Sequence, residues 1–430
     1  MTRWDEHRAE RHLRSLELFG MRFGLEKMRR MMTVLEAPQR RFDSIHIVGT
    51  NGKTSTARMT AAILERHGVR TGTYTSPHLV SYRERIQVTE RELSGARFAA
   101  AVARAAWAAE RVNRTLSDDD HVTQFELLTA AALWEMARQE VQVAVVEAGL
   151  GGRYDATSVI GSQLVVLTNV GLEHTRWLGS TLRDIAEEKL AVVGDGATLI
   201  CGADLAPAAG EVAARVAGER GARVLQAEEE DLPKLGAAGA FQRRNFALAR
   251  AAAQAFLERA GIEARAAGIA TAAAATQVPG RMQVVAQEPL TVLDAAHNPH
   301  ASAALADSLD DLVGGRPLGL VLGVLEDKDA AGMLAILLER CESAWFTAPP
   351  SPRALSPAAL QSHARRLGFD SVACEQTPAR ALAQAQRWAR ACGGAVLVTG
   401  SVYLVGDLLA ELAPAGRAAA SQGRRRGAGG

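Results

Sequence analysis

The sequence lacks long hydrophobic runs, and its first residues lack the features of an export signal. No apolar stretch approaches the roughly 20 residues that a helix needs to cross a bilayer. The segment from Met1 to Gly20 is rich in Arg, Glu and His, with neither the apolar core nor the small-residue cleavage site of a signal peptide. These absences predict a cytoplasmic protein with no membrane partner.

Cysteine is scarce, and net charge is nearly absent. Cys201, Cys341, Cys374 and Cys392 form no CxxC pair and have no nearby histidine cluster at zinc-ligand spacing, so we expect buried thiols in a reducing compartment rather than disulfides or a structural metal. A formal net charge of +1 gives no global field that would steer the protein onto nucleic acid. The expected partners are therefore small molecules, with no nucleic acid among them, and we expect a monomer.

Short aliphatic runs alternate with Ala/Leu/Arg-rich segments of helical period, which is the pattern of α/β folds built on parallel sheets. The expected strands are 44–48, 144–146, 164–168, 290–293, 318–321, 344–347 and 395–398, and the clearest helices are 55–66, 99–112 and 125–138. A chain of 430 residues exceeds the size at which one core stops growing, so it predicts two domains of unequal size.

The domain boundary is predicted where a helical pattern breaks. An Ala-rich helical segment, 263–276, is followed by Gln-Val-Pro-Gly-Arg at 277–281, which cannot continue the helix. We therefore expect one domain at 1–278 and a smaller one at 279–415. The Ser/Gly/Ala-rich end of the chain, 416–430, contains the basic run 424–426 and is predicted to be a disordered tail.

A glycine-rich turn between a strand and a helix is the first sign of chemistry. The strand expected at 45–48 leads into Gly49-Thr50-Asn51-Gly52-Lys53-Thr54-Ser55, and a helix follows at once. That order suits a phosphate-binding loop, because the glycines let backbone N–H groups close around phosphate, the lysine neutralises its charge and a hydroxyl can reach Mg²⁺. The spacing is shorter than GxxxxGK[ST], with Ile47 in place of the first glycine, so the pattern alone leaves an idle glycine turn open.

Two polar residues follow buried strands. Glu147 ends the apolar run 143–146, and a carboxylate buried there would need a cation such as Mg²⁺. The alternative is that it emerges into solvent. His174 lies just beyond the next strand, at the edge where open α/β sheets bind ligands. A lone histidine is usually structural, but the placement of His174 beside Glu147 and the Lys53 loop favours a metal contact, although Mg²⁺ prefers oxygen ligands to imidazole.

At two further sites, the residues alone give little indication of function. Lys189 follows two glutamates in a helical segment, and it reads as a surface lysine that forms i,i+3 ion pairs. In the second domain, Asp294 and His297 close another buried strand, and this polar edge facing the first would form an interdomain cleft. The residues by themselves therefore predict a two-lobed, nucleotide-using α/β enzyme and no more.

Taken together, the motifs resemble the folylpolyglutamate synthase and dihydrofolate synthase branch of the Mur ligase family. The resemblance runs from about Leu16 to Leu409. Its motifs are 49–53, 74–79, 84–86, 125–126, 147–155, 188–189, 242–245, 279–281, 294–299, 327–329 and 399–404. Many specific motifs in one order leave little room for coincidence.

The resemblance implies an N-terminal P-loop ATPase domain with a mainly parallel sheet flanked by helices, and a C-terminal Rossmann-like glutamate-ligase domain. It implies roles for matching residues, as follows: ATP phosphates at Gly49, Thr50, Asn51, Gly52, Lys53, Thr54 and Ser55; other nucleotide contacts at Asn245, Arg281 and Asp294; two Mg²⁺ ions at Ser76, Glu147 and His174; and dihydropteroate at Thr123, Gln124, Phe125, Glu126, Tyr154, Asp155 and Ala156. Lys189 matches a lysine that is carbamylated in this family, which overturns its reading as a surface residue.

The reaction implied is ATP-dependent ligation through an acyl phosphate. A substrate carboxylate attacks the γ-phosphate of ATP, and the amine of L-glutamate then displaces phosphate. We expect both activities of the branch, with dihydropteroate and tetrahydrofolate mono- or polyglutamates as acceptors. Asp294 and His297 are expected to meet glutamate and to complete the nucleotide site, which places them with Lys53 and Lys189 among the catalytic candidates.

Three departures from the family pattern accompany the resemblance. Thr54 stands where many relatives have glycine, and Ala295 stands where glycine is commoner, but both variants occur within the family and neither disturbs the assignment. The third is the segment 225–241, which looks short, as if a β-rich excursion were missing.

Competing interpretations stay open at this stage. A peptidoglycan Mur ligase shares the chemistry, but it normally carries an extra domain ahead of its phosphate loop, and here 48 residues precede Gly49. A P-loop protein that hydrolyses ATP without ligation is a second alternative, and an inactive descendant is a third. Within the folate branch, a single activity instead of two remains an alternative.

Overall fold

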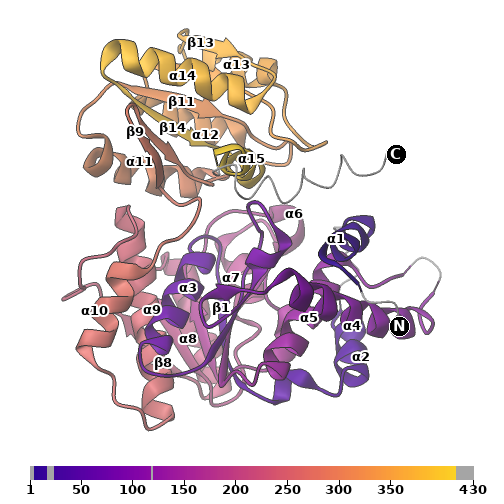
Figure 1. The fold of residues 1–430 in the computed structure, drawn as a ribbon. Coiled ribbons are helices and arrows are strands. Elements are labelled where there is room, and N and C mark those ends of the chain that lie inside the picture. The colour runs from indigo at the N-terminus through magenta and orange to yellow at the C-terminus, as the bar shows by residue number, and fades with distance from the viewer. Residues whose placement is uncertain (1–3, 17–23, 118–119, 413–430) are drawn as a thin grey trace, which may run out of the picture. The chain divides into compact units, whose positions relative to one another are not determined.

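The computed structural model describes residues 4–16, 24–117 and 120–412, and within these it divides into two compact units (Figure 1). The first unit spans 1–278 and the second spans 279–430. The expected tail at 416–430 lies outside the described residues. Among the helices that are described, none is both long and apolar enough to cross a membrane.

The first unit is built on a sheet of eight strands in the order β4-β3-β2-β5-β1-β6-β7-β8. The strands are β1 (Asp43–Val48), β2 (Thr71–Tyr74), β3 (Ile86–Val88), β4 (Arg91–Glu92), β5 (Val143–Glu147), β6 (Leu164–Leu167), β7 (Thr198–Gly202) and β8 (Arg223–Ala227). In this spatial order, each neighbouring pair from β2 through β5, β1, β6 and β7 to β8 is parallel. Strands β3 and β4 add an antiparallel edge next to β2. The mainly parallel sheet predicted for this domain is confirmed.

Helices cover both faces of this sheet. They are α1 (Glu6–Ser15), α2 (Glu26–Val34), α3 (Lys53–Glu65), α4 (Gly95–Asn113), α5 (Gln124–Arg138), α6 (Thr175–Leu178), α7 (Leu182–Leu190), α8 (Pro207–Arg220), α9 (Ala240–Arg259) and α10 (Ala266–Ala275), with short 3-10 helices η1 (Pro38–Arg40), η2 (Tyr82–Arg85) and η3 (Ala156–Ile160). Along β5, Val143 and Val145 pack with α3, α9 and α10, while Ala144 and Val146 pack with α2, α4 and α5. This alternation buries both faces, which explains why β5 reads as a continuous apolar run.

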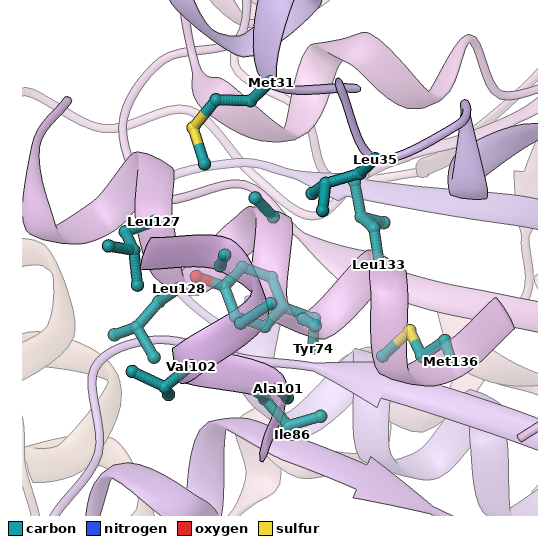
Figure 2. Close-up of a cluster of buried hydrophobic side chains, with 14 of the residues drawn as sticks. Met31, Leu35, Tyr74, Ile86, Ala101, Val102, Leu127, Leu128, Leu133 and Met136 are labelled. Carbon is teal, nitrogen blue, oxygen red and sulfur yellow. The ribbon is translucent and has the colours of Figure 1, made fainter. Parts of the chain in front are cut away.

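A tyrosine lies within the core beneath α5 (Figure 2). Tyr74, the last residue of β2, is fully buried among side chains that include Leu128 and Met136. Its hydroxyl accepts a hydrogen bond from Thr129 Oγ1 at 3.1 Å. Burial raises the pKa of Tyr74 to about 12, so it stays neutral and fixes the end of the strand that leads into the loop at Ser76.

The second unit contains a sheet of six strands in the order β13-β12-β11-β14-β10-β9, in which only β9 runs antiparallel. The strands are β9 (Gln283–Gln287), β10 (Leu290–Leu293), β11 (Leu318–Leu322), β12 (Ser343–Phe346), β13 (Val372–Cys374) and β14 (Ala395–Thr399). The helices are α11 (Pro299–Val313), α12 (Ala330–Leu337), α13 (Pro357–Arg366), α14 (Pro378–Cys392) and α15 (Val402–Leu412), and η4 (Leu338–Arg340) is a 3-10 helix. The predicted Rossmann-like alternation of strand and helix is confirmed.

Two expectations about individual positions were wrong. Cys374 and Cys392 are exposed, because each is the last residue of an element, the edge strand β13 and helix α14 respectively. The helix expected from position 263 begins only at Ala266, since the residues before it are extended. All four cysteines are free, as expected.

Candidate functional site

The glycine-rich turn joins β1 to α3 and adopts a conformation that its two glycines permit. Gly49 has φ +145° and Gly52 has φ +84°, both in the region that side chains disfavour. A Cβ at Gly49 would lie 1.9 Å from Thr168 Oγ1. The backbone of this turn is therefore fixed by its neighbours, as a phosphate-binding loop requires.

The segment that follows β6 holds the loop in place. Thr168 Oγ1 donates to the Asn51 carbonyl at 2.6 Å, and Asn169 Nδ2 donates to the same carbonyl at 3.1 Å. Asn51 N donates to Asn169 Oδ1 at 3.0 Å, and Thr50 Oγ1 accepts from Gly171 N at 3.0 Å. Sequence reasoning missed Thr168 and Asn169, although polar residues directly after a buried strand were the available signal.

Two lysines meet at one backbone carbonyl of the loop. Lys53 Nζ donates to the carbonyls of Gly49 at 3.1 Å and Thr50 at 2.8 Å, and Lys189 Nζ donates to the Gly49 carbonyl at 2.8 Å. Lys189 is only 4% exposed, so the interpretation as a surface lysine was wrong. Burial, and then the charge of Lys53, lower the pKa of Lys189 to about 7.

A buried carboxylate lies beside the start of α3. Glu147, the last residue of β5, is 2% exposed, so the alternative that it emerges into solvent is wrong. Its carboxylate accepts from Thr54 Oγ1 at 2.8 Å and from Ser76 N at 3.1 Å. The fold thus brings together three segments, at 54, 76 and 147, that are far apart in sequence. Ser55, the other hydroxyl of the motif, is buried in the first turn of α3.

His174 occupies a strained position ahead of α6. It has φ +53° and precedes the first residue of that helix, and its side chain is 37% exposed. Its Nε2 lies 3.7 Å from Glu173 Oε1. Among the described residues, no group of three or more His, Cys, Asp and Glu side chains is arranged to hold a metal ion. The oxygens that the structure brings together at this edge are the Glu147 carboxylate and the Thr54 hydroxyl.

The loop after β5 combines a close packing contact with a rigid internal carboxylate. A Cβ at Gly149 would lie 2.5 Å from Phe125 Cζ, so the phenylalanine ring packs directly on this backbone. Asp155 accepts hydrogen bonds from Leu150 N at 2.7 Å and Thr157 N at 3.0 Å, and its burial raises the pKa of its carboxyl. Asp155 therefore shapes the loop from within.

The predicted pteroate-binding residues fall into two groups: side chains that are buried or hydrogen-bonded within the protein, and aromatic rings that are at least partly exposed. Thr123 and Glu126 form the capping box of α5, and the Gln124 amide donates to the Leu13 carbonyl at 2.7 Å, so these three side chains have structural partners. Ala156 is buried in η3. In contrast, Tyr154 is 47% exposed. Of this set, the half-buried ring of Phe125 and the exposed ring of Tyr154 are the surfaces best suited to stack on an aromatic ligand.

Asn245 lies against the phosphate loop. It belongs to the first turns of α9, which packs on α3, and it is 6% exposed. Its Oδ1 would be 2.3 Å from a Cβ at Gly52. The structure therefore places Asn245, predicted to contact nucleotide, directly beside the loop.

In the second unit, Asp294 organises the end of β10. Its carboxylate accepts from Met282 N at 2.9 Å and from Ala296 N at 2.7 Å, and it is 2% exposed. Burial raises the pKa of Asp294, and the charge of Arg281 opposes that rise. His297 Nδ1 lies 2.9 Å from the Ala295 carbonyl, directly before α11. These groups gather at the carboxyl end of β10, the edge at which parallel sheets bind ligands.

Comparison with known proteins agrees with this arrangement. Residues 47–209 match the Mur ligase middle domain, and residues 280–402 match the Mur ligase glutamate ligase domain. A dihydrofolate synthase/folylpolyglutamate synthase from Escherichia coli is 33% identical over 81% of this chain and 83% of its own length. A probable bifunctional folylpolyglutamate synthase/dihydropteroate synthase of Haloferax volcanii is 35% identical to this chain. The match spans 94% of this chain but only 50% of the length of that relative.

Solved structures show the same fold. Folylpolyglutamate synthase of Mycobacterium tuberculosis complexed with ADP and AMPPCP superposes with a TM-score of 0.88 at 30% identity, covering 95% of this chain and 99% of that one. The bifunctional enzyme of Yersinia pestis complexed with AMPPNP and a Mn ion gives 0.81 at 29% identity, covering 95% and 98%. This chain belongs to the dihydrofolate synthase/folylpolyglutamate synthase family of Mur ligases.

Proposed function

We propose that this protein is an ATP-dependent ligase that joins L-glutamate to dihydropteroate, giving dihydrofolate, and to the γ-carboxyl of tetrahydrofolate mono- or polyglutamates. One observation carries the proposal: the side chains of Lys53 and Lys189 both donate to the Gly49 carbonyl of the glycine-rich loop. The helix that follows this loop contacts the buried carboxylate of Glu147 through Thr54. The cation of Lys53, beside backbone N–H groups and a carboxylate, suits phosphoryl transfer, which depends on positioning and charge neutralisation. We further propose that it acts as a cytoplasmic monomer.

The reaction proceeds in two displacements. The acceptor carboxylate oxygen bonds to the γ-phosphorus of ATP as the bond to the β,γ-bridging oxygen breaks, which releases ADP and leaves an acyl phosphate. The loop N–H groups and Lys53 stabilise charge on the transferring group. The glutamate amine then attacks the acyl carbon, and phosphate leaves as the amine loses a proton. We assign Asn245, Arg281 and Asp294 to the nucleotide, and Asp294 with His297 to the glutamate step.

Mg²⁺ fits the oxygen donors at the sheet edge. The Glu147 carboxylate, with the Thr54 hydroxyl beside it, is buried at the end of β5, where a dication would compensate a charge that otherwise costs free energy to bury. We propose that Ser76, Glu147 and His174 hold two such ions. When bound, Mg²⁺ supplies neutralisation of the phosphate charge.

The low pKa of Lys189 predicts carbamylation. Because burial lowers the pKa of this amine to about 7, its neutral form is accessible near neutral pH. Only the neutral amine adds CO₂, releasing one proton. We expect ¹³C NMR of enzyme equilibrated with ¹³C-bicarbonate to show a carbamate resonance that grows as the pH rises through about 7 and disappears in Lys189→Met. A resonance that survives in that variant would belong to another amine.

ADP release tests the proposed function. Purified protein with Mg·ATP and L-glutamate receives dihydropteroate in one assay and tetrahydrofolate in another, and we expect both to stimulate release. Stimulation by one acceptor alone would restrict the enzyme to one activity. Release that neither acceptor stimulates, in a protein that still binds ATP, would refute the proposal and favour a different Mur-type acceptor.

A further inference from the structure

Gln242 and Asn245 form a buried amide pair near the start of α9. The two positions are three apart, so their side chains lie on one face of the helix. Asn245 Nδ2 donates to Gln242 Oε1 at 2.9 Å, with Gln242 0% exposed and Asn245 6% exposed. Buried polar groups hold one conformation when they are hydrogen-bonded, so this contact fixes the rotation of the Asn245 amide.

That rotation determines which atom faces the phosphate loop. With its nitrogen turned to Gln242, Asn245 presents Oδ1 to Gly52, where a Cβ would lie only 2.3 Å from that oxygen. Gly52 has φ +84° and directly precedes α3, and its carbonyl accepts the first hydrogen bond of the helix from Thr56 N at 2.9 Å. Asn245 therefore supports the loop at the point where it becomes a helix.

Without an acceptor at 242, little would distinguish the two orientations of the Asn245 amide. Its oxygen and nitrogen are similar in size but opposite in hydrogen bonding, so a 180° turn would place NH₂ hydrogens against Gly52. Gln242 contributes its oxygen alone to this arrangement, because its Nε2 is buried with no hydrogen-bond partner among the described residues.

We propose that Gln242 is a positioning residue for nucleotide binding: it orients Asn245, and Asn245 in turn holds Gly52 and the phosphate loop in the shape that binds ATP. The inference rests on the proposed function and adds to it a residue one contact removed from the loop. A purely structural role for Gln242 would alter stability alone. The positioning role instead predicts an effect on ATP that depends on the presence of Asn245.

The test uses Gln242→Met, which removes the acceptor while keeping a side chain of similar length. We expect Gln242→Met to raise Kd and KM for Mg·ATP by about tenfold, the effect of one net hydrogen bond, with KM for acceptor and glutamate unchanged. Arg243→Met, an exposed change on the next residue, is the control.

A double variant separates positioning from packing. In an Asn245→Ala background, adding Gln242→Met should weaken ATP binding no further, because Gln242 acts through Asn245. An additional loss there, or normal ATP affinity in folded Gln242→Met, would overturn the inference. If Gln242→Met does not fold, Gln242→Asn withdraws the oxygen and serves the same comparison. Wild-type protein that binds no ATP would instead refute the proposed function.

Discussion

Turnover in a Lys53→Met variant is expected to fall by roughly 1000-fold with the fold intact, the upper range for removing one preorganised group that stabilises transition-state charge. Within the part of the chain that the structure describes, Lys53 donates to carbonyls of its own loop, at Gly49 and Thr50, and methionine preserves most of its apolar stem. Stability should therefore change little, while the charge that meets the transferring phosphoryl group is lost. Steady-state ADP release with each acceptor measures the effect, and thermal unfolding verifies the fold.

The same variant has a second, independent readout. The charge of Lys53 contributes to lowering the pKa of Lys189, so removing it should raise that pKa and shift the carbamate titration to higher pH. Lys234→Met removes an exposed lysine that is distant from Lys53 in the sequence. This variant should leave both the turnover and the carbamate titration of Lys189 unchanged. Lys53→Met with normal turnover would remove Lys53 from the site, and an unshifted titration would show that the two ammonium groups do not interact.

Replacing Glu147 with glutamine is expected to weaken the apparent affinity for Mg²⁺ by at least about 100-fold, since even partners outside the metal's own ligands are worth roughly 10–100-fold. Glutamine keeps an oxygen that can accept from Thr54 Oγ1 or Ser76 N, so the local structure should hold. The charge that attracts the dication is lost. Titration with Mg²⁺ under saturating ATP, and Mn²⁺ binding without nucleotide, measure the change.

A matched control separates the effect of removing Glu147 from the general effect of removing a buried carboxylate. Glu135 on α5 is also fully buried, but it forms ion pairs with Arg97 at 3.3 Å and Arg138 at 3.0 Å. It lies far from the glycine-rich loop in the sequence. Glu135→Gln should lower the unfolding temperature without altering metal dependence in the folded fraction. Equal metal dependence in Glu147→Gln and wild type would contradict the assignment of Glu147 to the cation.

The course of the chain was largely predictable from local patterns. Apolar runs such as 143–146 and the strand, glycine turn and helix around Gly49 are determined by neighbouring residues, so they are legible without the fold. The family motifs likewise pointed to Asn245, which the structure places beside Gly52 of the glycine-rich turn. Even the departure at position 54 was visible in the sequence, although its consequence, a hydroxyl on Glu147, was not.

What the sequence by itself determined was the α/β class, the phosphate loop and the order of the motifs, because those depend on residues close together in the chain. Tertiary structure alone decided which polar groups are buried and what they meet. Lys189 reads as a surface lysine within its own helix, yet it lies 2.8 Å from the Gly49 carbonyl, 140 positions away. The hydrogen bond from Thr168 to the Asn51 carbonyl arises in the same way, since parallel strands bring distant loops to one edge of the sheet.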